Sequence, residues 1–214
     1  MSGVKRLIVM DVDSTLINEE VIDLLGEEAG IGAQVAEITD RAMRGELDFK
    51  EALSERVGLL AGLPASVFDR VLARVTFTTG ALELIGEAHA RGWEVGVVSG
   101  GFHEVADRVV ERAGIDHCLA NRLEVSDGVL TGRTCGDVVT RELKRETLLR
   151  WAGECGVDPA NTVAIGDGAN DIPMIQAAGI GIAFCAKPAT RAAAPYSITE
   201  RNLLRALDLI DALA

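Results

Sequence analysis

The stretch LIVMDVDSTL, residues 7–16, constrains the fold more than any other part of the chain. Four apolar residues lead directly into Asp11 and Asp13, with one valine between the two acids. An apolar run of this kind indicates a strand that is buried on both faces, as in parallel sheets. Because side chains alternate along a strand, the two carboxylates are expected to project together. Burial of an unpaired ionised group is costly, so the acids must lie at the exposed end of the strand or meet a cation there.

Three further apolar runs have the same character, and helical patterns separate most of them. The runs are WEVGVV (93–98), TVAIG (162–166) and GIGIAF (179–184), and the helical patterns cover residues 81–91, 103–113, 141–155 and 171–178. This alternation indicates βαβ units and therefore a doubly wound, mostly parallel α/β sheet of Rossmann-like type. In EVSDGVLTG (124–132), Asp127-Gly128 between alternating apolar residues predicts a β-hairpin.

The interval between the first two strands is too long for a single crossover. From Glu19 to Val75 it shows only helical periodicity, broken near residues 30–32, 45–48 and 62–64. We therefore expect three or four short helices that form a small cap domain over residues 17–76. The remaining residues, 1–16 and 77–214, would form the catalytic α/β core, which the chain re-enters at FTTG (77–80).

Composition excludes several classes of protein. Lys and Arg number 21 against 33 for Asp and Glu, a net charge of −12, which argues against nucleic acid or an anionic membrane surface as partner. The four cysteines are far apart, and the three histidines do not join them at zinc-ligand spacing, so no soft-metal site is expected. No signal peptide is recognisable and no run approaches the roughly 20 apolar residues of a membrane span. A cytoplasmic protein is therefore expected.

Three of the predicted strands end in polar, glycine-rich turns: DVDST, SGGF (99–102) and GDGAND (166–171). Open parallel sheets bind ligands beyond the carboxyl ends of their strands, so we expect these turns to meet at one edge. Asp11, Asp13 and Asp167 cannot all ionise side by side, because like charges raise one another's pKa. A hard divalent cation resolves the conflict, and oxygen ligands favour Mg²⁺. The alternative role of such aspartates, as helix caps and turn formers, explains one turn better than three at one edge.

These residues resemble the motifs of a known family. DVDSTL, Ser99, a later lysine and GDGAND are similar to the four motifs of the haloacid dehalogenase-like hydrolases. Within them, RAMRGELDF (41–49), SGGF, ANRL and FCAKP resemble the phosphoserine phosphatases, and the similarity runs from about residue 4 to residue 209. The resemblance implies a Mg²⁺-dependent enzyme that hydrolyses O-phospho-L-serine to L-serine and phosphate through an aspartyl-phosphate, the last step of serine biosynthesis.

The resemblance also implies a role for each residue of the motifs. Asp11 would attack phosphorus, and Asp13 would protonate the departing serine oxygen and then activate the attacking water. Asp11, Asp167 and the backbone carbonyl of Asp13 would hold Mg²⁺. Other residues would bind phosphoryl oxygens, contact the substrate or support the metal: Ser99, Gly100, Lys144, Asn170 and Asp171.

The lysine is the least constrained of these assignments. Arg141 and Arg145 flank Lys144 in RELKRET, and Lys187 in CAKP is another candidate cation. A lysine in such a helix is ordinarily a solvated surface charge. The choice of Lys144 therefore depends on the resemblance.

One cap position suggests substrate recognition without the resemblance. Arg56 falls on the apolar stripe of a predicted amphipathic helix formed by Phe49, Ala52, Leu53, Val57 and Leu60. Its guanidinium either extends past the edge of the core into water or faces a ligand anion, for which a carboxylate is well suited. The resemblance implies that Arg56 binds the substrate carboxylate and Glu20 its ammonium, with Phe49 and Met43 packing nearby. Glu20 is equally explained as a first-turn acid favoured by the helix dipole.

Two other classes of function stay open, one with the same chemistry and one without rapid turnover. The same scaffold could serve a broader small-metabolite phosphatase, or a phosphotransferase that passes the phosphoryl group to another alcohol. A receiver-like signalling module also combines a doubly wound sheet, an acceptor aspartate, a lysine and Mg²⁺, although the large cap and Asp13 favour rapid turnover. The cap of an enzyme should open and close, with Gly80 and the residues after Leu16 as expected hinges.

Overall fold

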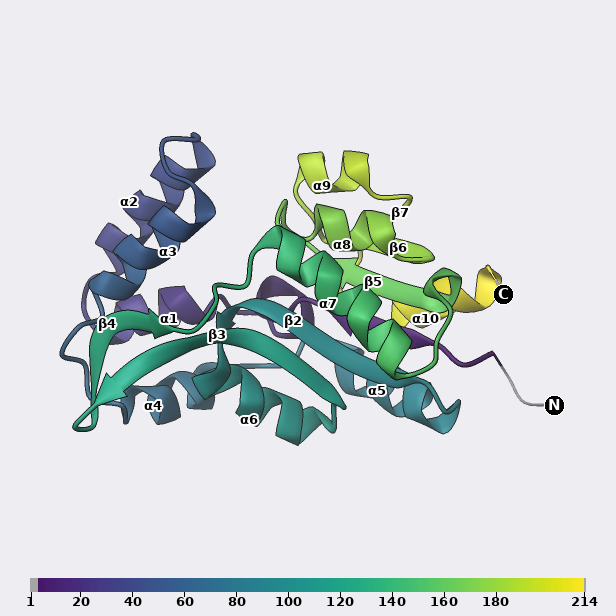
Figure 1. The fold of residues 1–214 in the computed structure, drawn as a ribbon, viewed down its shortest axis with the longest axis horizontal. Coiled ribbons are helices and arrows are strands. Elements are labelled where there is room, and N and C mark those ends of the chain that lie inside the picture. The colour runs from purple at the N-terminus through teal and green to yellow at the C-terminus, as the bar shows by residue number, and fades with distance from the viewer. Residues whose placement is uncertain (1–3, 214) are drawn as a thin grey trace.

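The computed structural model describes residues 4–213, apart from the side chain of Met43, and arranges them as one sheet with helices on both faces (Figure 1). The strands are β1 (Leu7–Met10), β2 (Glu94–Phe102), β3 (His117–Ser126), β4 (Val129–Cys135), β5 (Thr162–Gly166), β6 (Ile180–Phe184) and β7 (Tyr196–Ile198). The helices are α1 (Val21–Glu28), α2 (Gly32–Met43), α3 (Phe49–Gly58), α4 (Val67–Arg74), α5 (Ala81–Ala90), α6 (His103–Ala113), α7 (Arg141–Glu154), α8 (Ile172–Ala177), α9 (Pro188–Ala193) and α10 (Leu204–Ala212), with short turns η1 (Val12–Leu16) and η2 (Pro159–Asn161). Within residues 4–213, no helix has both the length and the apolar character that a membrane crossing requires.

The sheet has seven strands in the order β4-β3-β2-β1-β5-β6-β7, and all neighbours are parallel except β3 and β4. The predicted mostly parallel α/β fold is therefore confirmed. At the centre, Met10 of β1 pairs with Val97 of β2 and with Ile165 of β5. This register places the residues that follow all three strands at one edge. At β1 the strand order changes direction, with β2 on one side and β5 on the other. Open α/β sheets bind ligands at such a point.

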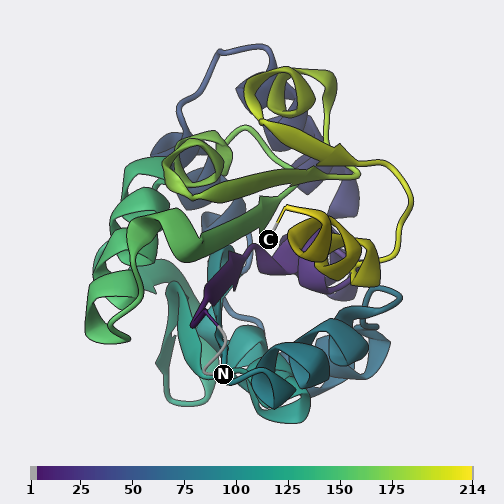
Figure 2. The same ribbon diagram turned by 90° about the vertical axis from the view of Figure 1, so that its right-hand side faces the viewer.

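The alternation of side chains along β1 divides the core into two apolar clusters. Ile8 and Met10 belong to the larger cluster, together with side chains of α5, α6 and α10, and Leu7 and Val9 belong to the smaller one, under α7 and α8. Figure 2 shows the same division, with α7 and α8 (green) on one side of the strands and α5 and α10 (teal and yellow) on the other. Burial on both faces explains why β1 is apolar at every position.

Four helices, α1 to α4, occupy the long interval between β1 and α5, as the sequence predicted. The two chain segments that connect them to the sheet run antiparallel, with Ile17 bridged to Phe77. The Asn18 N–H donates to the Thr76 carbonyl at 3.0 Å, and the Thr78 N–H donates to the Leu16 carbonyl at 2.9 Å. Apolar side chains of this inserted segment, including Leu53 and Val57 of α3 and Leu60 just after it, continue into the larger cluster. The division into a core and a cap at residues 17–76 stays a prediction.

The predicted hairpin joins β3 to β4 and also contacts the inserted helices. Asp127 and Gly128 both have positive φ, 51° and 78°, which is typical of a type I′ turn. Leu130 of β4 exchanges two backbone hydrogen bonds of 2.8 Å with the α3–α4 connection, donating to Leu63 and accepting from Gly62. Ala65 donates to the Gly128 carbonyl, also at 2.8 Å. The connection therefore covers an edge strand that would otherwise expose unpaired backbone groups.

The structure differs from the sequence prediction at two strand ends. Asp13 does not continue β1: the strand stops at Met10, and Asp13 lies in η1, where Ser14 has a positive φ of 56°. The expected turn SGGF is instead the irregular end of β2, because the pairing with β3 shifts register between Val98 and Phe102. A bulge of this kind redirects the backbone without ending the strand. The segments β7, α9 and α10 were not predicted.

Substitution of Gly181 tests how closely α8 packs on β6. A Cβ atom at this position would overlap the backbone carbonyl oxygen of Ile175. Because backbone cannot move as a flexible side chain can, Gly181→Ala is expected to lower the free energy of unfolding by about 3 kcal/mol. Gly153→Ala is the control, since a Cβ there meets nothing within 4 Å and α7 should gain about 0.5–1 kcal/mol. Urea unfolding measures both, and equal stabilities would contradict the packing described.

Candidate active site

Residues from β1, β5 and α7 meet at the carboxyl edge of the sheet around Asp11. The Asp11 carboxylate is buried, and its Oδ1 accepts a 2.8 Å hydrogen bond from the Val12 N–H at the start of η1. The Asp11 N–H donates to the Ile165 carbonyl at 3.0 Å, which continues the β1–β5 ladder. The backbone therefore fixes Asp11 on both sides, and its Oδ2 remains for other partners.

The partner of Asp11 Oδ2 is the ammonium group of Lys144, at 2.9 Å. The same Nζ donates to Asp171 Oδ1 at 2.7 Å, and Lys144 is only 1% exposed. Burial lowers the pKa of Lys144, but the charges of Asp11 and Asp171 outweigh it and the pKa is raised. Lys144 is therefore a fixed positive charge in the site rather than a solvated surface residue.

The rival cations do not lie at this position. Arg141, Arg145 and Lys187 are all exposed, whereas Lys144 is directed into the site from the first turn of α7. Thr140 caps that turn by accepting a 3.2 Å hydrogen bond from the Leu143 N–H. The local sequence thus fixes the start of α7 and, with it, the direction of the lysine.

Three carboxylates gather around this one ammonium. Asp11, Asp167 and Asp171 each place an oxygen within 4.8 Å of the others. Burial and then the charge of Asp171 raise the pKa of Asp11 to about 8 and that of Asp167 to about 6. Both shifts show that the cluster has less positive charge than its acids require. The three carboxylates could hold a metal ion, and they include Asp11 and Asp167, which the sequence predicted as ligands, and Asp171, which it predicted as a support for the metal.

The Asp13 side chain has an unusual environment for an acid. Its Oδ1 is buried and has no hydrogen-bond partner among the described residues. Its Oδ2 lies 2.7 Å from the position that a Cβ on Gly101 would occupy, so the glycine leaves room for it. Burial, then Glu20 and Asp11, raise the pKa of Asp13 well above its usual value. A carboxyl group of this kind holds a proton readily and can exchange it with a ligand.

The end of β2 forms the opposite wall of the site. Ser99 is buried, and its Oγ accepts a 2.8 Å hydrogen bond from the Gly101 N–H. The Asn121 amide group donates to the Gly100 carbonyl and accepts from the Val139 N–H, both at 2.8 Å. Asn121 was not predicted, although it belongs to the ANRL segment. Its role in holding the backbone is not visible in any sequence spacing.

Thr15 and Gly168 donate hydrogen bonds to the two acids that follow β5. The Thr15 hydroxyl donates to Asp167 Oδ1 at 3.3 Å, and the Gly168 N–H donates to Asp171 Oδ2 at 3.0 Å. Asn170 is half-buried, and its Oδ1 fills the space that a Cβ on Gly168 would need. Thr15, which lies two residues after Asp13 and is fully buried, was not predicted from the sequence.

Phe49 is exposed, whereas the sequence predicted it on the buried apolar stripe of its helix. Ala52, Leu53, Val57 and Leu60 are buried, but Phe49 is 37% exposed. The first turn of α3 extends beyond the apolar cluster, and the ring reaches β2 instead. Its Cζ lies 3.3 Å from the position that a Cβ on Gly100 would occupy. An aromatic ring from the inserted helices therefore lies against the segment that contains Ser99.

Arg56 and Glu20 approach the same site from the inserted helices. Arg56 is half-buried, and its guanidinium donates to the Ala52 carbonyl at 3.2 Å and to Thr39 Oγ1 at 3.4 Å. Burial lowers the pKa of Arg56, and the charges of Asp23, Glu20 and Asp13 oppose this effect. Glu20 is exposed and accepts a 2.6 Å hydrogen bond from Ser14 Oγ.

The remaining predicted residue is Met43. It lies at the end of α2, and its side chain is outside the described part of the structure. Its predicted contact with the substrate therefore stays a prediction.

Comparisons with known proteins agree with this geometry. The haloacid dehalogenase-like hydrolase family matches residues 8–176. A phosphoserine phosphatase of Streptococcus thermophilus is 61% identical over 211 residues, which cover 99% of this chain and 98% of the relative. Two solved structures, a phospho-aspartyl intermediate analogue of phosphoserine phosphatase and a substrate-bound phosphoserine phosphatase complex, each superimpose with a TM-score of 0.91 at 44% identity, over 97% of this chain and 99% of theirs. The chain therefore belongs to the haloacid dehalogenase-like hydrolases and, within them, to the phosphoserine phosphatase family.

Proposed function

We propose that this chain hydrolyses O-phospho-L-serine to L-serine and phosphate through an aspartyl-phosphate formed on Asp11, as the last step of serine biosynthesis. The observation that carries the proposal is the buried ion pair of Asp11 and Lys144 at the carboxyl end of the central strand. It combines a nucleophilic carboxylate with a fixed positive charge that can attract a phosphoryl group. The named activity of the relatives supports the choice of substrate.

We further propose Mg²⁺ as the cofactor, held by the Asp11 and Asp167 carboxylates and by the backbone carbonyl of Asp13. The donors are all oxygen atoms, and the ammonium group of Lys144 pairs with only two of the three clustered carboxylates, which suits a hard divalent cation. When bound, Mg²⁺ supplies positive charge that offsets the repulsion between Asp11 and the phosphate. Asp171, fixed by Lys144 and the Gly168 N–H, would support this arrangement.

The proposed reaction has two steps. First, an Asp11 carboxylate oxygen bonds to phosphorus as the bond from phosphorus to the serine oxygen breaks, and Asp13 gives its proton to that oxygen. Next, water attacks phosphorus, Asp13 takes a proton from the water, and the Asp11–phosphorus bond breaks to release phosphate. The buried Asp13 oxygen, which has no hydrogen-bond partner within the part of the chain that the structure describes, and the raised pKa of Asp13 support this proton-transfer role.

The groups on β2, β5 and α7 would bind the phosphoryl oxygens. Ser99 offers its hydroxyl, the N–H groups near Gly100 offer backbone donors, and Lys144 offers its charge. Because Gly100 and Gly101 lack side chains, the backbone can approach a ligand closely. Asn170, in the turn between β5 and α8, would hydrogen-bond the substrate or its phosphate.

The inserted helices would bind the carboxylate and the ammonium group of the substrate. Arg56 would bind the carboxylate and Glu20 the ammonium group, with Phe49 and Met43 packing over the substrate. The influence of Glu20 and Asp13 on the Arg56 guanidinium supports this placement beside the site. The Phe49 ring beside Gly100 supports a cap, residues 17–76, that covers the site during the reaction. A cytoplasmic location and a lack of nucleic-acid or membrane partners remain predictions from composition.

Replacement of the proposed nucleophile tests the reaction. Asp11→Asn keeps the size of the side chain but removes the attacking carboxylate, so kcat for O-phospho-L-serine should fall at least about 10³-fold. Phosphate release in the presence of Mg²⁺ measures the effect. Asp208→Asn, on the exposed surface of α10, is the control and should retain full activity. Intact turnover in the Asp11 variant would exclude the proposed intermediate.

Replacement of Arg56 tests the substrate. If its guanidinium binds the carboxylate of phosphoserine, Arg56→Ala loses a charge-assisted contact of about 2–3 kcal/mol, so kcat/KM for phosphoserine should fall roughly 30- to 150-fold. An aryl phosphate, which lacks the carboxylate, should be hydrolysed nearly as well as before. Arg70→Ala, on α4 and paired with Glu28, is the matched control. Equal losses on both substrates would favour a broader phosphatase instead.

The acid cluster predicts how Mg²⁺ affects stability at different pH values. Asp11 and Asp167 have folded pKa values of about 8 and about 6, against about 4 for aspartate in the unfolded chain. The folded state therefore binds more protons between these values, and without metal its stability should fall as pH rises from about 4 to about 8. Mg²⁺ should restore this loss, so the increase in Tm on adding Mg²⁺ should be larger at pH 8 than at pH 5.5. Thermal unfolding with Mg²⁺ or a chelator measures this difference.

The Asp167→Asn variant is the control for this effect. Removal of one acid lowers the repulsion and weakens Mg²⁺ binding, so the dependence of the Tm increase on pH should become smaller. An increase that is the same at both pH values in the unmodified chain would contradict a metal bound by these carboxylates.

A further inference from the structure

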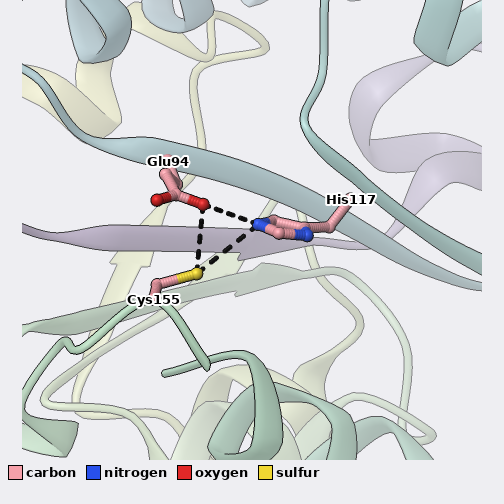
Figure 3. A group of neighbouring side chains, drawn as sticks. All are labelled: Glu94, His117 and Cys155. Atoms are coloured by element: carbon pink, nitrogen blue, oxygen red, sulfur yellow. Dashed lines mark hydrogen bonds and ion pairs between the residues drawn. The ribbon is translucent and has the colours of Figure 1, made fainter. Parts of the chain in front are cut away.

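A second group of metal-ligand side chains lies away from the Asp11 site. Figure 3 shows Glu94, His117 and Cys155 pointing toward one another from three separate elements. Glu94 begins β2, His117 begins β3, and Cys155 is the C-cap residue of α7. His117 Nε2 lies 2.7 Å from Glu94 Oε2, and Cys155 Sγ lies 3.1 Å from the same oxygen and 3.5 Å from Nε2.

This group is at the opposite edge of the sheet from Asp11. Glu94 pairs with Leu7, the first residue of β1, whereas Asp11 follows the last residue of that strand. Asp11 lies four residues of extended chain beyond Leu7, a distance of roughly 13 Å. The group therefore plays no part in the proposed hydrolysis.

We propose that Glu94, His117 and Cys155 bind one divalent transition-metal ion of the Zn²⁺ type, with water completing its coordination. Imidazole nitrogen, thiolate sulfur and carboxylate oxygen are the ligands that Zn²⁺ takes in proteins. Zn²⁺ bonds of about 2.0–2.3 Å set tetrahedral ligand atoms roughly 3.3–3.6 Å apart, so the three side chains need only separate by a few tenths of an ångström. The Cys155 thiol loses its proton to solvent as the metal–sulfur bond forms.

The ligands are held in place by their surroundings. The His117 ring stacks on Trp151 with ring centroids 5.2 Å apart, and Gly96 leaves room for that indole, since a Cβ there would lie 2.7 Å from it. Lys5 Nζ donates to Glu94 Oε1 at 2.9 Å, which leaves Oε2 facing the other two ligands. Partners that orient a ligand in this way are a regular feature of metal sites. Binding of the metal ion therefore requires little movement of the three ligand side chains.

The site is also accessible, because the side chains of His117 and Glu94 are 25% and 30% exposed. An ion can enter from solvent, and water can occupy the open position. The cluster of His103, Asp107 and Cys118 is less suitable. There, one ring nitrogen of His103 bonds Asp107 at 2.6 Å, and the other accepts a 3.1 Å hydrogen bond from a backbone N–H that does not belong to the cluster.

Titration with Co²⁺ tests the proposal without using enzyme activity. Co²⁺ replaces Zn²⁺ in such sites, and a cobalt–thiolate bond gives a charge-transfer absorption that oxygen ligands at the Asp11 site cannot give. With saturating Mg²⁺ present, one equivalent of Co²⁺ should produce this band, and one equivalent of Zn²⁺ should remove it. Cys155→Ser should abolish the band, and His117→Phe, which keeps a ring to stack on Trp151, should weaken Co²⁺ binding at least about tenfold.

Cys118→Ser is the matched control, because it removes the cysteine of the other cluster, and it should keep the band. Absence of the band in the unmodified chain, or its persistence in Cys155→Ser, overturns the proposal. Near-ultraviolet circular dichroism checks that each variant is folded. If Cys155→Ser does not fold, Glu94→Gln decides: a weakening of Co²⁺ binding by about tenfold supports the site, and unchanged binding overturns it.

Discussion

The buried ammonium group of Lys144 is the charge on which the rest of the catalytic edge depends. Two carboxylates, Asp11 and Asp171, lie within 3 Å of it, and a carboxylate that is buried without a positive neighbour is costly. Their positions are set by β1 and by the β5–α8 turn, whereas Lys144 comes from α7. The lysine therefore joins three elements that are distant in sequence. A buried charge network of this kind contributes less to net stability than to the selection of a single arrangement.

Much of this architecture was predictable because it depends on local pattern. The segment 162–166 and the helix 103–113 have the predicted bounds, since β-branched residues and helical periodicity act over a few neighbours. Asp127-Gly128 likewise specified its own turn. Asp13 was harder: the alternation rule placed it on the strand, whereas the chain turns after Met10. The prediction that it lies beside Asp11 depended on the motif and not on the strand geometry.

Other features could not be predicted from spacing, because they arise from the way strands assemble. Asn121 holds the backbone at Gly100 across 21 residues, and no local pattern distinguishes it from a surface asparagine. The spacing of the cysteines and histidines predicts no soft-metal site. The fold nevertheless places His117 and Cys155 beside Glu94, although 61 residues separate Glu94 from Cys155. Parallel pairing brings the starts of β2 and β3 together, and the length of α7 returns Cys155 to the same edge.

The backbone hydrogen bonds between the hairpin and the α3–α4 connection restrict how substrate can enter. Three N–H···O=C bonds at Gly62, Leu130 and Ala65 tie this connection to β4. Rotation of all four inserted helices as a rigid lid would break these three bonds at the same time, whereas none of the three involves α2 or the first turn of α3. Admission of a ligand should then involve bending of that outer pair, with α4 and the hairpin as stationary supports. The inserted helices would then move by bending of α2 and the start of α3, and not as one rigid body.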